Sequence, residues 1–189
     1  ENITAGRDGS RLNLTVDAKD NTFTGYLLLL DRLDDEEYNH LKSFTTYTLR
    51  TKHKLEIVYP GASNLTEEVF EGIKQDFSAF EKMLYSYDYD NDQYGYENII
   101  DVDSFVDYFL INEFTCNYDA GWLSTFMYKD IDGKFRMCIW DFNSACDNYQ
   151  QAMMPANHFE MQNCLWYFML MKDEHFTERC VERYRELRK

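Results

Sequence analysis

The stretch that decides the fold runs from residue 101 to residue 143 and reads DVDSFVDYFLINEFTCNYDAGWLSTFMYKDIDGKFRMCIWDFN. It begins with Asp101, a good helix N-cap, and apolar side chains then recur at helical spacing to about residue 115. Two alternating segments follow at 123–129 and 134–140, separated by four residues that end in a glycine able to take a positive φ. The stretch therefore predicts a helix, a loop and a β-hairpin.

Two aspartates lie at the ends of this hairpin. Asp119 is in the loop before the first strand, and Asp141 directly follows the second strand. Because a hairpin brings its two ends together, we expect both carboxylates at one edge of the sheet. One of them could bind a magnesium ion that bridges phosphate oxygens, and the other could orient or deprotonate an attacking hydroxyl. Ordinary turn aspartates are the alternative interpretation.

The rest of the chain is predicted to form strands before residue 60 and mostly helices after it. Alternation and short apolar runs predict strands at 12–16, 25–30, 44–50 and 55–59, with a charged loop at 31–39. A long helix is expected from Thr66, with acidic residues in its first turn, and two further helices at 160–171 and 175–188.

These elements predict an α+β fold. We expect a single domain over 1–189, with a strand-rich part over 1–60 and a helical part over 61–189 that contains the 123–140 hairpin. The sheet is expected to be small and mixed, and the core to be mainly helical.

Composition excludes several classes of protein. Hydrophobic residues make up 44% of the 189 residues and aromatic residues 17%, which is too much apolar surface for a disordered acidic tail despite a net charge of -15. The 34 acidic residues outnumber the 19 basic ones, which argues against nucleic acid as a partner. No apolar run reaches membrane-spanning length. The five cysteines lack CxxC spacing, so we expect buried free thiols rather than a zinc site or a disulfide framework.

Two further features have simple interpretations. Residues 88–92 resemble the start of a calcium loop, but Gln93 and Ile99 stand where such a loop needs Gly and Glu. We therefore predict a solvated acidic loop there. Lys129, on the hairpin, could reach a phosphate, whereas a solvated surface lysine is the simpler interpretation.

Four linked motifs resemble those of the CotH family of atypical protein kinases. The helix at 101–113 is similar to the helix before the family's catalytic loop, and Asn117-Tyr118-Asp119 resembles its N-x-D loop. Tyr128-Lys129-Asp130 looks like the family's tyrosine-containing hairpin, and Trp140-Asp141-Phe142 matches its W-D-F motif. The resemblance extends over about residues 25–188.

The resemblance implies an atypical protein-kinase-like C-terminal lobe that uses Mg²⁺ and ATP. Asp119 would be the catalytic aspartate, and Asp141 the metal ligand. Ser124 and Asn143 would be cofactor-binding positions, although the family's pattern has aspartate where Asn143 stands, and kinases commonly have asparagine where Ser124 stands. The partners implied are ATP and a protein substrate at the cell surface or spore coat, with an extracellular location.

Two functional classes remain open at this point. In the first, the chain is part of a kinase that phosphorylates Ser or Thr in proteins. We expect it to be inactive alone, because the family's basic nucleotide-binding region would lie before the segment at 25–30 and this chain is expected to begin too late to contain it. In the second, the chain is a non-catalytic interaction domain that serves surface assembly. Neither class involves nucleic acid or a membrane span.

Overall fold

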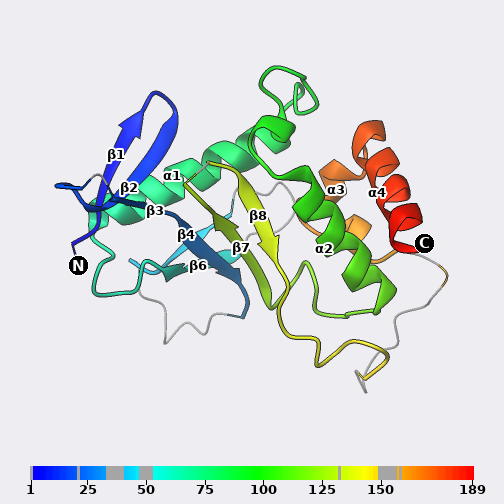
Figure 1. The fold of residues 1–189 in the computed structure, drawn as a ribbon. Helices are drawn as coiled ribbons and strands as arrows, with labels where there is room; N and C mark the ends of the chain where they lie inside the picture. The colour runs from blue at the N-terminus through cyan, green and yellow to red at the C-terminus, as the bar shows by residue number, and fades with distance from the viewer. Residues whose placement is uncertain are drawn as a thin grey trace.

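The structure is a computed structural model that describes residues 2–20, 22–32, 41–46, 53–131, 133–148, 157 and 159–189. It is an α+β fold with two antiparallel sheets (Figure 1). The three-stranded sheet has the order β1 (Thr4–Asp8), β2 (Arg11–Asp17), β3 (Thr22–Thr24). The five-stranded sheet has the order β5 (Ser43–Thr45), β6 (Lys54–Tyr59), β4 (Tyr26–Leu30), β7 (Thr125–Lys129), β8 (Phe135–Cys138).

The helices begin at residues whose side chains cap them. They are α1 (Glu67–Leu84), α2 (Val102–Phe114), α3 (Tyr167–Leu170) and α4 (Glu174–Leu187), together with the 3-10 turns η1 (Tyr96–Asn98) and η2 (Met161–Asn163). Thr66, Asp101 and Asp173 each accept a hydrogen bond from a backbone N–H of the first turn of α1, α2 and α4. Each cap satisfies a donor that the helix itself leaves unpaired.

Helix α1 covers one face of the five-stranded sheet through aromatic side chains. The Phe77 and Phe80 rings lie with their centroids 5.6 Å and 5.1 Å from that of Phe135 on β8. Phe77 also contacts Trp166, near α3, at 5.8 Å. Leu28, in the middle of β4, is fully buried on the same sheet. Strands and helices therefore share the core, and the prediction of a mainly helical core is wrong.

Helix α2 closes the outer edge of β8, which would otherwise expose backbone groups. Phe135 N–H donates to Ile99 O at 2.9 Å, and Asp101 N–H donates to Phe135 O at 2.8 Å. Two residues further along β8, Met137 N–H donates to Ser104 Oγ at 2.8 Å. The hairpin is thus held between β4 on one side and the start of α2 on the other.

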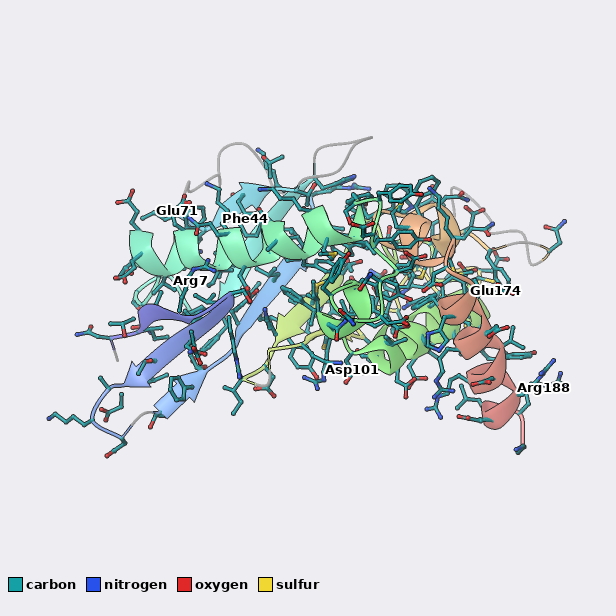
Figure 2. All side chains as sticks on the ribbon, turned by 90° about the horizontal axis from the view of Figure 1, so that it is seen from above. Arg7, Phe44, Glu71, Asp101, Glu174 and Arg188 are labelled. Carbon is teal, nitrogen blue, oxygen red and sulfur yellow. The ribbon has the colours of Figure 1, made fainter. Side chains whose placement is uncertain are left out.

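Helix α4 packs on α2 at the end of the molecule opposite the three-stranded sheet. Figure 2 shows Glu174 and Arg188 of α4 far from Arg7 of β1 and Glu71 of α1. Two ion pairs join the helices, Arg179 with Asp103 and Arg183 with Asp107, each with an N–O distance of 2.7 Å.

Most of the predicted elements are confirmed, with three corrections. The sheet is not mixed, because every ladder between described strands is antiparallel and the parallel contact between Ile100 and Phe135 is an isolated bridge. The helix expected at 160–171 is two short pieces, since Leu165 takes a positive φ of 25° between η2 and α3. Strands β1 and β3 were not predicted. Most of the loop expected at 31–39 and the end of the strand expected at 44–50 lie outside the described residues.

All five thiols are free, as expected, but only Cys164 and Cys180 are buried. Burial raises the pKa of the Cys164 thiol well above its usual range. Within the described ranges, no helix combines the length and the apolar character that crossing a membrane requires.

Candidate active site at the mouth of the β7–β8 hairpin

The candidate site lies at the edge of the five-stranded sheet where β7 begins and where β4 and β8 end. Because β4 and β8 both run antiparallel to β7, they end at the edge where β7 begins (Figure 1). Leu30, the last residue of β4, pairs with Thr125, the first residue of β7. Asp31 and Ser124 are the next residues outward, so the pairing places them side by side. Asp141 reaches the same edge three residues after β8 ends.

Ser124 lies between two carboxylates. Its Oγ is 3.5 Å from Asp141 Oδ2 and also 3.5 Å from Asp31 Oδ2. These contacts are longer than an ordinary O–H···O hydrogen bond, so the carboxylate lone pairs stay available to another partner. All three residues are half-buried.

The backbone at this edge is strained at the two positions that matter most. Ser124 has φ 47° and Asp141 has φ 49°, in the left-handed region that residues with a Cβ seldom adopt. Asn143 N–H donates to Asp141 Oδ1 at 3.3 Å, which helps to hold that carboxylate. Such conformations persist where the surroundings enforce them, and they cluster at functional sites.

Asp119 lies in a tight turn between α2 and β7. Its carbonyl accepts hydrogen bonds from Trp122 N–H at 3.1 Å and Leu123 N–H at 2.8 Å. The turn requires Gly121, because its φ is 82° and a Cβ there would lie 2.9 Å from Cys164 Cβ. The buried Ser144 hydroxyl donates a short hydrogen bond to Asp119 Oδ2, which fixes the carboxylate and leaves its second oxygen for another partner.

Asn117 ties this turn to α2 and to Asp141. Its buried Nδ2 donates to Asn112 Oδ1 at 2.9 Å and approaches the Asp141 carbonyl at 3.4 Å. Asn112 is itself fixed, since its Nδ2 donates to Tyr108 O at 2.8 Å. Asn117 therefore sets the spacing between the loop that carries Asp119 and the segment that carries Asp141.

The four predicted site residues gather at this edge, but the two aspartates are not bonded directly to each other. Asp141 lies beside Ser124, whereas Asp119 lies beside Ser144, whose Oγ is 3.0 Å from Asn143 Oδ1. Ser144 and Asp31 were not among the predicted site residues. Asp31 directly follows a predicted strand and ends the upstream stretch, residues 25–31, that also shares the family resemblance.

Lys129 contradicts both interpretations suggested by the sequence. It is 8% exposed and lies at the other end of β7, so it is neither a solvated surface lysine nor near the carboxylates. Its Nζ is 2.7 Å from Asp76 Oδ2 on α1. The Tyr26 hydroxyl donates to the same oxygen at 2.7 Å. Burial, with the Asp76 charge beside it, raises the pKa of Tyr26 well above its usual range.

The oxygen atoms of the site fit a magnesium ion that is bound together with phosphates. Within the described ranges, Asp31, Asp119 and Asp141 form no ion pair with a basic side chain. In the same part of the chain, no group of three His, Cys, Asp or Glu side chains could hold a metal by itself. Mg²⁺ is usually held by one or two carboxylates plus water and substrate phosphates, which matches this donor set.

Exposed aromatic side chains flank the two aspartates. Tyr118 and Trp122 lie on either side of Asp119 in the chain, and Trp140 and Phe142 on either side of Asp141. The Trp140 ring packs on Phe126 of β7 at a centroid distance of 5.3 Å.

Comparison with known proteins gives one match. A family model described as CotH kinase protein matches residues 15–189, which is nearly the whole chain. No curated protein and no solved structure matches the chain. The motifs around Asp119 and Asp141 lie within the matched range. The chain therefore belongs to the CotH family.

Proposed function

We propose that this chain forms a kinase-like C-terminal lobe that carries the acidic part of a phosphotransfer site. The reaction is transfer of the γ-phosphoryl group of ATP to a Ser or Thr hydroxyl of a protein at a cell surface or spore coat. The observation that supports it is the meeting of Asp119, Ser124 and Asp141 at one sheet edge, in the order helix, loop, hairpin, aspartate. That order is the one protein kinases use.

Each residue has a definite role in this reaction. When bound, Mg²⁺ neutralises the charge that develops on the phosphates. Asp141 would hold the ion, with the Ser124 hydroxyl and the Asn143 amide as neutral oxygen donors beside it. Asp119, fixed by Ser144, would orient the substrate hydroxyl and accept its proton as the oxygen bonds to the γ-phosphorus. The bond from that phosphorus to the ADP oxygen breaks at the same time, and ADP leaves.

A second candidate is a non-catalytic interaction domain. Asn143 is neutral where the family's pattern has an aspartate, and Ser124 is a weaker neutral ligand than the asparagine that kinases commonly have there. Both differences weaken a metal site. The structure also has an open, largely apolar groove of about 1420 Å³ between α2, α4 and the end of β8. Its lining includes Phe114, 81% exposed, and Ile139, 60% exposed.

Two measurements separate the candidates. On the full-length protein, calorimetry measures magnesium-dependent ATP binding, and transfer of labelled phosphate to a Ser- and Thr-rich protein measures catalysis. We expect Asp141→Asn to abolish magnesium-dependent binding. Asp119→Asn should retain binding and lower transfer by about 10²- to 10⁴-fold, the usual contribution of a general base. Asp130→Asn, at the opposite end of the hairpin, is the matched control and should change neither quantity.

The outcomes are distinct. Binding that Asp141→Asn removes, without any transfer, would support a nucleotide-binding domain without catalysis. Absence of magnesium-dependent binding by the unmodified protein would reject the kinase proposal, and the interaction domain would replace it.

A further inference from the structure

Asp31 stands at the same sheet edge but comes from a distant part of the sequence. It directly follows β4, whereas Ser124 and Asp141 belong to the hairpin. We propose that Asp31 is a second carboxylate ligand of the divalent cation, acting with Asp141 across Ser124. This inference rests on the proposed metal-dependent function and adds to it a residue that the W-D-F and N-x-D motifs do not include.

The sheet register fixes the position of Asp31. Five consecutive pairs join β4 to β7, from Tyr26 with Lys129 to Leu30 with Thr125. Leu28 and Met127, in the middle of this ladder, are both buried, so a shift by one residue would turn buried side chains outward. Core packing of β4 against β7 therefore places Asp31 next to Ser124.

The distances suit a cation held between the two carboxylates. Asp31 Oδ2 and Asp141 Oδ2 each lie 3.5 Å from Ser124 Oγ, so they are no more than about 7 Å apart. Two oxygens bound to one Mg²⁺ at about 2.1 Å lie at most about 4.2 Å apart. The proposal therefore requires that the two oxygens come within about 4.2 Å of each other when the ion binds. The Ser124 hydroxyl lies between them and could be a third oxygen donor.

Charge also favours a cation between Asp31 and Asp141. Asp31 Oδ1 accepts a hydrogen bond from the backbone N–H of Arg32 at 2.7 Å, and Oδ2 is turned to Ser124. Two carboxylates this close repel each other unless a cation compensates them. Asn143, the neighbouring amide, brings no charge and is exposed. Asp31 thus supplies the second negative charge that the hairpin segment itself lacks.

The test is binding of Mn²⁺, a paramagnetic substitute for Mg²⁺, measured by electron paramagnetic resonance without substrate turnover. We compare the unmodified protein with Asp31→Asn, Asp141→Asn and Asp88→Asn. The last is the matched control, because Asp88 is exposed and lies in the loop after α1. We expect Asp31→Asn and Asp141→Asn each to weaken Mn²⁺ binding at least about tenfold, since even supporting partners of metal ligands contribute that much. Asp88→Asn should leave binding unchanged.

A second measurement does not depend on how the variants fold. In the unmodified protein, saturation with diamagnetic Mg²⁺ should shift the side-chain carboxylate carbon resonances of both Asp31 and Asp141 in heteronuclear NMR spectra. Unchanged affinity of a folded Asp31→Asn protein, or a carboxylate shift at Asp141 without one at Asp31, would overturn the role of Asp31 and leave the proposed function intact. If Asp141→Asn also binds normally, or the unmodified protein shows no saturable binding, both proposals fail.

Discussion

The buried ion pair between Asp76 and Lys129 gives a quantitative test of what holds the central strand β7 to α1. Asp76 is 6% exposed and Lys129 is 8% exposed, and their charged atoms are 2.7 Å apart. The perturbation is Asp76→Asn, which keeps the shape and one hydrogen-bond acceptor but removes the negative charge. Lys129 then remains buried as an unpaired cation beside Phe135, 4.8 Å from the ring centroid.

The expected cost follows from the geometry. At 2.7 Å and an effective dielectric constant of about 20, the attraction is about 6 kcal/mol, and desolvation of the two charges offsets part of it. Removing one partner of a buried pair usually costs about 3–5 kcal/mol. The amide oxygen can still accept from Tyr26, so we expect the lower value, about 3 kcal/mol. For a chain of this size, that lowers Tm by about 6–12 °C.

Urea unfolding followed by circular dichroism measures this cost. The double variant Asp76→Asn/Lys129→Met should recover to within about 1 kcal/mol of the unmodified protein, because no buried charge is left unpaired. The matched control is Glu71→Gln, which breaks an ion pair of 2.8 Å on the same helix. Its partners are 42% and 43% exposed, so the loss should be below about 0.5 kcal/mol.

Two results would refute this reasoning. A loss for Asp76→Asn as small as that of the surface control would mean that the pair is not desolvated. A double variant as unstable as Asp76→Asn alone would mean that the cost arises from some contact of Asp76 other than its pairing with Lys129.

Two further predictions concern pH and the core. A hydrogen bond to Glu97 and the charge of that carboxylate raise the pKa of His175 above its ordinary value of 6.5. The His175–Glu97 pair therefore stabilises the fold fully below pH 6.5, and this contribution is lost as the pH rises through the raised pKa. His175→Gln should therefore flatten the decrease of stability between about pH 6 and pH 8 in urea titrations, and an unchanged profile would contradict it. Phe77→Ala should lower the free energy of unfolding by about 3–5 kcal/mol, because the fully buried ring contacts four other aromatic side chains. Phe114→Ala, at an exposed ring, should change it by less than about 0.5 kcal/mol in the same assay. Equal losses would refute the assignment of Phe77 to the core.

The parts of the site that sequence could predict are those that local structure determines. Asp119 and Asp141 flank one hairpin, so turn chemistry and alternation were enough to expect them at the same sheet edge. Asp31 could not be found in this way, because it meets Ser124 from 93 residues away and only through the β4–β7 register. Ser144 was missed for a related reason: a serine in an aperiodic segment gives no pattern until the loop is folded against Asp119.

The errors in the fold also come from contacts between distant segments. The apolar spacing of 160–171 is compatible with one helix, but Trp166 is buried and its Nε1 donates to Glu81 Oε1 of α1 at 2.9 Å. That contact and the positive φ of Leu165 break the segment. Lys129 was assigned to the surface because its partner Asp76 is 53 residues away in sequence. Propensity and periodicity reflect only residues that are close in sequence. The structure of the 160–171 segment and the burial of Lys129 depend on partners that are distant in sequence, which periodicity does not show.

Strand β7 connects the stabilising pair to the candidate site. Lys129 is its last residue and Ser124 directly precedes its first, so the two lie about 17 Å apart at the usual rise of an antiparallel strand. The ion pair with Asp76 anchors one end of β7 to α1, and the pairing with β4 and β8 carries that anchoring to the other end. The Asp76–Lys129 pair does not contact the carboxylates of the candidate site. Asp76→Asn should therefore lower the fraction of protein that is folded, and the protein that stays folded should keep its affinity for a divalent cation.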